Sequence, residues 1–171
     1  LALMALTHAR RAARIGPDRL GISMMAGVGR EGLTDALALG AKTAIVRAMP
    51  NTPSTVGLGV TGVAGGASAS AAVVELVRDI FETVGAAIIV REDQINAVAA
   101  VSGSGPAYLF LYTEEMTAAA MRLGFDEDQA RLLAQQTVIG AAELLRQSGE
   151  DPAELRRRVT SPKGTTEQAI L

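Results

Sequence analysis

The side chains best suited to chemistry lie near the end of the chain, in the stretch TSPKGTTEQAI at residues 160–170. Hydroxyls, a positive charge and a tight turn come together there, from Ser161, Lys163, Gly164, Thr165 and Thr166. The free backbone N–H groups of the helix that follows can bind a carboxylate or a phosphate. The other interpretation is a plain helix start in which Glu167 is the capping partner.

Two predicted strands end in unusual loops. The strand over residues 19–25 leads into Ala26 and Gly27, which are small enough for a ligand to approach the backbone. The strand over residues 42–49 leads into PNTP, where Asn51 supplies a donor and an acceptor between two prolines. Because parallel strands have their carboxyl ends at one edge of a sheet, both loops can line one ligand site. The alternative is that both are ordinary strand-to-helix turns.

The stretch VSGSGPAYLF at residues 101–110 places two Ser-Gly pairs ahead of an apolar run. Pro106 suits the first position of a helix and Ser104 is a possible N-cap, so the stretch is first of all a helix start. It lacks the Lys-Ser/Thr ending of a P-loop and is not G-x-G-x-x-G. The backbone of Ser104 and Gly105 remains able to approach a small ligand.

The remaining titratable groups are weaker candidates. His8 lies beside Arg10 and Arg11 in an apolar helix, where a solvated or capping role is favoured over base catalysis. Glu114 and Glu115 point about 100° apart on a helix, which makes them a poor acid–base pair. Since the chain has no cysteine and a single histidine, a transition-metal site is not expected.

The composition indicates a globular chain, since 49% of its 171 residues are hydrophobic and 20% are charged. A formal charge of −2 gives no basic field for nucleic acids or anionic lipids. No apolar stretch reaches the length of a membrane span, and charge follows the first apolar residues rather than preceding them. We therefore expect a cytoplasmic protein without nucleic-acid or membrane partners.

Residues 1–91 alternate short β-type runs with helical ones. Strands are predicted over 19–25, 42–49, 58–66 and 86–91, and helices over 1–14, 29–40 and 68–85. Such alternation is typical of an α/β layer with a largely parallel sheet.

Residues 92–171 carry no strand signal and predict an all-α half. Its helices are predicted over 92–103, 106–124, 126–149, 151–161 and from 165 onward. The second of these is apolar over most of its circumference, and a helix of that kind is buried on nearly all sides. A half-chain of this size can hardly surround it, so we expect a partner subunit that completes the core.

Three motifs in order are similar to one family, the pyrroline-5-carboxylate reductases. They are RAMPNTP at 47–53, AVSGSGPAYLF at 100–110 and VTSPKGTTEQAI at 159–170, and SMMAGV at 23–28 resembles a fourth family segment. The resemblance implies a nucleotide-binding domain over 1–91 with a doubly wound, Rossmann-like sheet. It also implies a helical dimerisation and substrate-binding domain over 92–171, through which two subunits interlock, sometimes in larger rings of dimers.

The resemblance further implies an enzyme of proline biosynthesis. In the family, NADPH or NADH gives hydride to the C=N carbon of 1-pyrroline-5-carboxylate and yields L-proline. Cofactor contacts are then expected at Ala26, Gly27, Met49, Pro50 and Asn51. Substrate contacts are expected at Ser104, Gly105, Ser161, Gly164 and Thr165. The Thr166 hydroxyl would bond the ring nitrogen, which has to be protonated or hydrogen-bonded in the transition state.

The sequence departs from the family pattern in two ways. Lys163 stands where the family often has glycine. No G-x-G-x-x-G loop precedes Leu1, and the chain stops at Leu171 inside the last predicted helix, so we expect a fragment that is inactive alone. The alternatives are a non-catalytic helical assembly module and a related reductase of another cyclic imine. A hydroxy-acid reductase is disfavoured because it would need a lysine general acid facing the nicotinamide.

Overall fold

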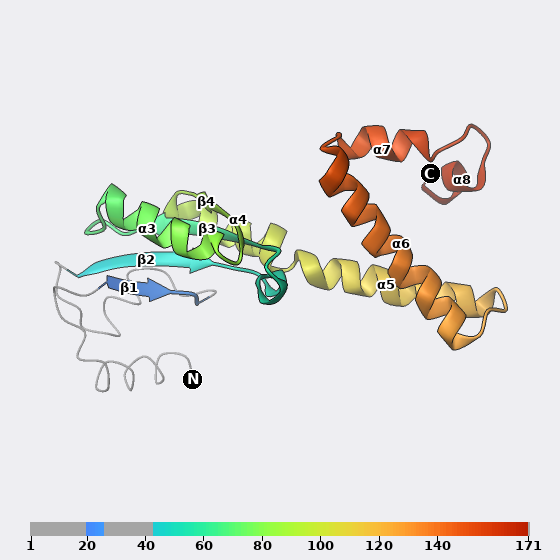
Figure 1. The fold of residues 1–171 in the computed structure, drawn as a ribbon, viewed down its shortest axis with the longest axis horizontal. Coiled ribbons are helices and arrows are strands. Elements are labelled where there is room, and N and C mark those ends of the chain that lie inside the picture. The colour runs from blue at the N-terminus through green and yellow to red at the C-terminus, as the bar shows by residue number, and fades with distance from the viewer. Residues whose placement is uncertain (1–19, 26–42, 171) are drawn as a thin grey trace. The chain divides into compact units, whose positions relative to one another are not determined.

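The computed structural model describes residues 20–25 and 43–170 (Figure 1). The helices predicted over 1–14 and 29–40 lie outside the described residues, as do His8, Ala26 and Gly27. The chain divides into two compact units, residues 1–108 and 109–171. The domain boundary predicted after Arg91 stays a prediction.

The first unit contains a four-stranded sheet whose strands follow one another in chain order. They are β1 (Leu20–Ser23), β2 (Ala44–Met49), β3 (Gly59–Gly65) and β4 (Gly85–Ile89). The first three strands lie within the runs that predict them, and β4 begins one residue before its predicted run of 86–91, so the strand predictions are confirmed.

The sheet is mixed, with two parallel strand pairs and one antiparallel pair. β1 pairs with β2 and β3 pairs with β4 in parallel, whereas β2 and β3 are antiparallel. The connection over residues 50–58 is a short loop around the 3-10 turn η1 (Thr52–Val56). A parallel crossover needs about a dozen residues or more, so this connection returns the chain in the opposite direction. The α/β character of this half is confirmed, and the antiparallel pair is the departure from the prediction.

One face of the sheet is covered by helix α3 (Ala71–Glu82). The hydroxyl of Ser70 caps this helix by accepting a hydrogen bond from the Val73 N–H. Buried valines join the two elements, with Val74 and Val77 of α3 packed against Val46 and Val63 of the sheet.

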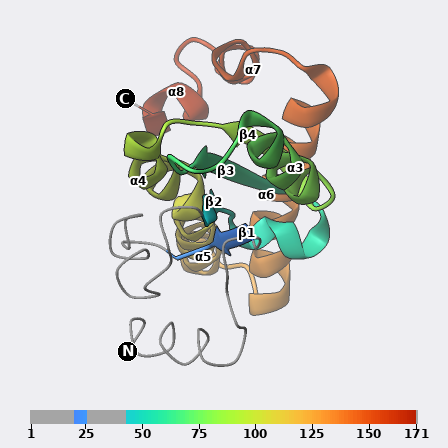
Figure 2. The same cartoon turned by 90° about the vertical axis from the view of Figure 1, so that its left-hand side faces the viewer.

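The opposite face is covered by the short helix α4 (Ile95–Val98). Successive residues of a strand point to opposite faces, so Ala64 faces α4 while its neighbour Val63 faces α3. Ile95, Met49 and Ala64 form the buried cluster on this side. Figure 2 shows α3 and α4 on the two sides of β3.

The segment predicted as one helix over 92–103 is helical in three geometries. A 3-10 turn, η2 (Glu92–Gln94), precedes α4, and a π-turn, η3 (Ala99–Gly103), follows it. In the π-turn the Ser104 N–H donates to the Ala99 carbonyl at 2.8 Å. Ser104 has helical dihedral angles, φ −85° and ψ −22°. An N-cap residue is typically extended, so Ser104 is not the N-cap that the sequence offered, and α5 (Gly105–Arg122) continues directly from the π-turn.

The remaining helices are α6 (Glu127–Ser148), α7 (Pro152–Arg158) and α8 (Thr165–Ile170). Asp126 caps α6 by accepting from the Gln129 N–H, and Asp151 caps α7 by accepting from the Ala153 N–H. Gly149 ends α6 in the left-handed conformation with φ 63°. The predicted all-α half is confirmed.

Helix α5 leaves large apolar side chains exposed on every side. Five consecutive positions are open to solvent, namely Tyr108, Leu109, Phe110, Leu111 and Tyr112. On α6, Leu132, Leu133, Ile139, Leu144 and Leu145 are also exposed. Within the described part of the second unit, Ala130 and Ala134 are the buried hydrophobic residues. Among the described residues no helix combines the length and apolarity needed to cross a bilayer.

We predict that Gly85→Ala is strongly destabilising. Gly85 starts β4 at φ 146°, and a Cβ there would overlap the backbone of Gly59 on β3. The substitution should lower the free energy of unfolding in urea by about 2–4 kcal/mol. Gly21→Ala in β1 is the matched control, because its Cβ would lie 3.8 Å from the nearest atom. An equal loss in both variants would contradict the prediction.

Candidate functional site

The carboxyl ends of β1 and β2 lie at one edge of the sheet, because the two strands are parallel with Ser23 opposite Arg47. Met49 ends β2 as a buried residue, in the cluster with Ile95 and Ala64. Its side chain therefore serves the core, and its main chain is the part that can meet a ligand. Pro50, which follows, is half-buried.

The Asn51 side chain is engaged at both ends by the protein. Its Oδ1 accepts a hydrogen bond from the Val60 N–H at 2.9 Å. Its Nδ2 donates to the Ser102 carbonyl at 3.1 Å. The structure thus brings the loop after β2 next to the Ser-Gly turn, two segments that the sequence singled out separately.

The Ser-Gly turn is half-buried from Ser102 to Gly105. Ser102 is held from both sides, since its own hydroxyl donates to the Val98 carbonyl at 3.0 Å while its carbonyl accepts from Asn51. A Cβ added at Gly105 would meet no atom within 4 Å. The backbone at Gly105 therefore adjoins open space, where a small ligand has access.

A buried cation, Arg47, lies beneath this edge. Its Nη1 lies 2.8 Å from Glu92 Oε1, with exposed side-chain fractions of 6% for Arg47 and 31% for Glu92. Its Nη2 donates to the Met25 carbonyl at 3.5 Å. Sequence reasoning assigned Arg47 no role, although an arginine within an apolar strand was a readable signal that a carboxylate would be needed. Arg47 thus joins β2 to η2 and to the segment that follows β1.

The predicted anion turn at residues 160–166 lies in the second unit. Ser161 and Thr165 are exposed, and Gly164 and Thr166 are half-buried. The Gly164 N–H donates to the Ser161 carbonyl at 3.0 Å, which closes a tight turn. A Cβ at Gly164 would lie 3.0 Å from that same carbonyl oxygen, so glycine suits this position.

Glu167 is the capping partner of this turn, as the second interpretation had it. Its Oε2 accepts from the Lys163 N–H at 2.6 Å. Lys163 itself has φ 60°, a left-handed conformation in which glycine is less strained. Within the described residues, the Thr166 hydroxyl donates no hydrogen bond to protein, which leaves it available to a ligand.

A hollow of about 730 Å³ lies next to this turn between α7 and α8. Arg156, Arg157, Thr160 and Glu167 contribute its polar lining. Arg157 is paired with Glu154, and the arginine run 156–158 is exposed, as expected for a solvated helix face. The Arg156 guanidinium makes the surroundings of the turn more positive.

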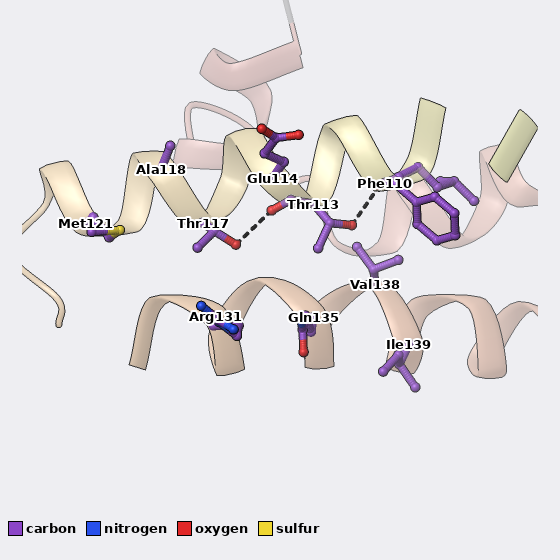
Figure 3. Close-up of a pocket in the computed structure, with 11 residues that line it drawn as sticks. Phe110, Thr113, Glu114, Thr117, Ala118, Met121, Arg131, Gln135, Val138 and Ile139 are labelled. Atoms are coloured by element: carbon purple, nitrogen blue, oxygen red, sulfur yellow. Dashed lines mark hydrogen bonds between the residues drawn. The ribbon is translucent and has the colours of Figure 1, made fainter. Parts of the chain in front are cut away.

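A second, more apolar hollow of about 660 Å³ lies between α5 and α6 (Figure 3). Its large apolar lining residues are Leu109, Phe110, Met121, Val138 and Ile139. Thr113 and Thr117 bond to carbonyls of their own helix, at Leu109 and Thr113, so their hydroxyls are already used. This hollow suits apolar side chains better than a polar substrate.

The pKa shifts that are resolved fall on surface pairs rather than on these residues. Hydrogen bonds from Arg146 and then Gln147 lower the pKa of Glu143 to about 2. A hydrogen bond from Arg91 lowers the pKa of Asp93. The ionised carboxylates of Glu143 and Asp93 therefore stabilise the folded chain at a pH above the ordinary carboxyl pKa. This stabilisation is lost as the pH falls through the lowered pKa of each group.

Comparison with known proteins relates the chain to one family. Residues 92–171 match the family described as pyrroline-5-carboxylate reductase dimerisation. The pyrroline-5-carboxylate reductase of Pseudomonas aeruginosa is 45% identical over 155 residues, which are 90% of this chain and 56% of that protein. Residues 92–171 belong to this dimerisation family, and the chain as a whole is similar to the pyrroline-5-carboxylate reductases. It spans little more than half the length of the curated relatives it matches.

Solved structures of the family have the same fold. A pyrroline-5-carboxylate reductase from Coxiella burnetii aligns with a TM-score of 0.82 and 41% identity, over 98% of this chain and 62% of that one. The Plasmodium falciparum enzyme, solved with NADP bound, aligns with a TM-score of 0.83 and 27% identity, over 99% of this chain and 66% of that one. The predicted architecture, a Rossmann-like part followed by a helical part, is thus confirmed.

We predict that the Arg47–Glu92 pair contributes to stability through its burial. Glu92→Gln leaves the buried guanidinium without its counter-charge and should cost about 1–3 kcal/mol, less than a fully buried pair because Glu92 is partly exposed. In an Arg47→Met background the same change should cost less than about 0.5 kcal/mol. Urea unfolding of the four proteins measures the coupling.

The matched control for this cycle is Glu75→Gln. Its ion pair with Arg78 lies on the surface of α3, with exposed fractions of 48% and 34%. That substitution should cost about 0–1 kcal/mol. Equal costs for Glu92→Gln in both backgrounds would show that the Arg47–Glu92 pair does not act as a unit.

Proposed function

We propose that the full-length gene product reduces 1-pyrroline-5-carboxylate to L-proline with hydride from NADPH or NADH. The observation that carries the proposal is the turn at residues 160–166, where the half-buried Thr166 lies in the first turn of α8, the part of a helix whose backbone N–H groups lack intrahelical partners. An imine that carries a carboxylate needs a hydroxyl donor and N–H groups of this kind. Relatives that bear the name of this activity support the same conclusion.

The edge after β1 and β2 fits a dinucleotide. Parallel strands that end together there, and a half-buried Pro50 beyond them, form the kind of edge at which α/β sheets bind such ligands. We assign the main chain of Met49 and Pro50 to cofactor binding, with Ala26 and Gly27 as further expected contacts. The bound nicotinamide supplies the hydride. The protein contributes binding, orientation and charge stabilisation.

The turn at 160–166 would hold the substrate carboxylate. Backbone N–H groups at the start of α8 donate to anions, with Ser161, Gly164 and Thr165 as the contributors. Lys163 and Arg156 add positive charge near them. The Glu167 carboxylate already takes the Lys163 N–H, so the substrate would use the N–H groups beyond it. In the first unit, Ser104 and Gly105 stay expected substrate contacts, because the backbone at Gly105 adjoins open space.

Thr166 is the proposed catalytic residue. As hydride reaches the imine carbon, electron density moves onto the ring nitrogen, and a hydroxyl donor stabilises that nitrogen in the transition state. A hydroxyl does this without a shifted pKa. No histidine, cysteine or metal ion is required by this mechanism, since the difficult chemistry belongs to the cofactor.

We also propose that two copies of the chain cover each other's α5 and α6. The exposed run from Tyr108 to Tyr112 is too apolar to remain in water, and patches of this kind mark interaction surfaces. The match of residues 92–171 to a dimerisation family supports a second copy as the occupant. A ring of dimers and a cytoplasmic location are further parts of this proposal.

For the reaction, Thr166→Ala in the full-length product should reduce kcat/KM for 1-pyrroline-5-carboxylate by about tenfold or more, because the donor to the ring nitrogen is lost. Thr166→Ser keeps the hydroxyl and should retain most of the activity. Thr83→Ala, at the exposed end of α3, is the control. NADPH oxidation followed by absorbance measures all three, and unchanged turnover in Thr166→Ala would remove Thr166 from the mechanism.

For the assembly, sedimentation at micromolar concentration should show at least a dimer. Phe110→Glu places a charge in the apolar surface of α5 and should weaken dimerisation by about tenfold or more. Leu76→Glu is the matched control, since Leu76 is an exposed apolar residue of α3, 53% exposed. A stable monomer for the unchanged protein would rule out this interface.

A further inference from the structure

Asn51 joins three segments of the first unit through one side chain. It follows β2, its Oδ1 accepts from the Val60 N–H in β3 at 2.9 Å, and its Nδ2 donates to the Ser102 carbonyl of the π-turn at 3.1 Å. These two bonds fix the orientation of the amide. The group that resemblance assigns to the cofactor is therefore already bonded on both sides by the protein.

The Ser102 carbonyl lacks its usual helical partner, so the Asn51 side chain is its hydrogen-bond donor. In an α-helix, a carbonyl accepts from the N–H four residues later, and for Ser102 that residue is Pro106, which has no N–H. The next candidate, the Ala107 N–H, donates to the Ser104 carbonyl instead, at 3.0 Å. The proline that starts α5 thus leaves a half-buried acceptor unpaired, and Asn51 supplies the missing donor.

We propose that Asn51 is a positioning residue that acts through the Ser102 carbonyl. By satisfying the acceptor that Pro106 leaves open, it holds the backbone of Ser104 and Gly105, the two substrate contacts proposed for the first unit, near the carboxyl end of β2. This inference rests on the proposed reductase function. It assigns to Asn51 a role in substrate binding, instead of the direct cofactor contact that the resemblance suggests.

Two substitutions separate the bonds of Asn51. Asn51→Asp retains an oxygen that accepts from Val60 but sets a second oxygen against the Ser102 carbonyl. Asn51→Ala removes both bonds. Thr55→Ala is the control in the same loop, because its hydroxyl is exposed and bonds only within η1, to the Thr52 carbonyl at 2.9 Å.

The measurements are the KM for 1-pyrroline-5-carboxylate, kcat, and the dissociation constant of NADPH from a fluorescence titration of the full-length product. In Asn51→Asp we expect the substrate KM to rise by about tenfold or more while the NADPH dissociation constant changes by less than about threefold. Thr55→Ala should leave all three unchanged. A weakened NADPH affinity with an unchanged substrate KM would make Asn51 a cofactor ligand and overturn the proposal.

A rescue variant tests the link to Pro106. Pro106→Ala restores an N–H at the position that an α-helix uses, so the Ser102 carbonyl regains a donor. Asn51→Ala should raise the substrate KM by some factor in the unchanged protein. In the Pro106→Ala background that factor should be smaller by about threefold or more. A purely structural or cofactor-binding role predicts no such rescue, and equal effects in both backgrounds would overturn the proposal.

The failure of the proposed function is distinguishable from the failure of this inference. If the unchanged product does not reduce 1-pyrroline-5-carboxylate, the reductase proposal fails. Amide hydrogen exchange then tests separately whether Asn51 anchors residues 102–105. Faster exchange confined to residues 102–105 in Asn51→Asp supports the anchor. Exchange that is unchanged there, or raised equally across β3, overturns it.

Discussion

The structure of the first unit depends on the close packing of β3 between two helices. Both faces of this strand are covered, and two glycines make the approach possible. A Cβ at Gly62 would lie 2.8 Å from a Val98 methyl group on the α4 side, and one at Gly65 would lie 2.5 Å from a Val74 methyl group on the α3 side. With α4 seated on the sheet at this distance, the π-turn that follows it is brought to the carboxyl end of β2.

Polar contacts then determine the details of that edge. Arg47 and Met49 lie on the same face of β2, so one pairs with Glu92 while the other joins the α4 cluster. Asn51, just beyond the strand, reaches the π-turn. The side chains of Arg47, Met49 and Asn51 in the motif RAMPNTP thus make structural contacts. The part of this motif that is open to a ligand is its main chain, and the side chains hold that main chain in place through their contacts within the protein.

Much of the fold was predictable because its signals are local. Ser70, Asp126 and Asp151 each precede a helical run and cap it, and Gly149 ends a helix in the conformation that glycine favours. The antiparallel β2–β3 pair was readable in principle from the shortness of the connection over 50–58. The period of a strand gives no information on its direction, so the alternation of elements alone favoured a parallel sheet.

The site was less predictable because its contacts are distant in sequence. The bond from Asn51 to Ser102 and the pair of Arg47 with Glu92 join residues that no spacing relates. The π-turn was missed for a different reason. A proline after a Ser-Gly pair normally indicates the start of a new helix. The Ser102 carbonyl, which cannot pair with Pro106, is identified only when the structure shows Asn51 as its donor. The turn with Lys163 could be predicted in outline, with Glu167 as its cap.

The exposed apolar surface of α5 has a thermodynamic consequence for the whole molecule. If a second copy covers it, the helix is fully ordered only in the complex, and folding and association become one equilibrium. The midpoint of thermal unfolding then rises with protein concentration, by mass action. A substitution on α5 that lies far from any ligand would then lower the amount of folded protein as well as its activity. A chain that does not dimerise would leave its apolar helix α5 exposed to water.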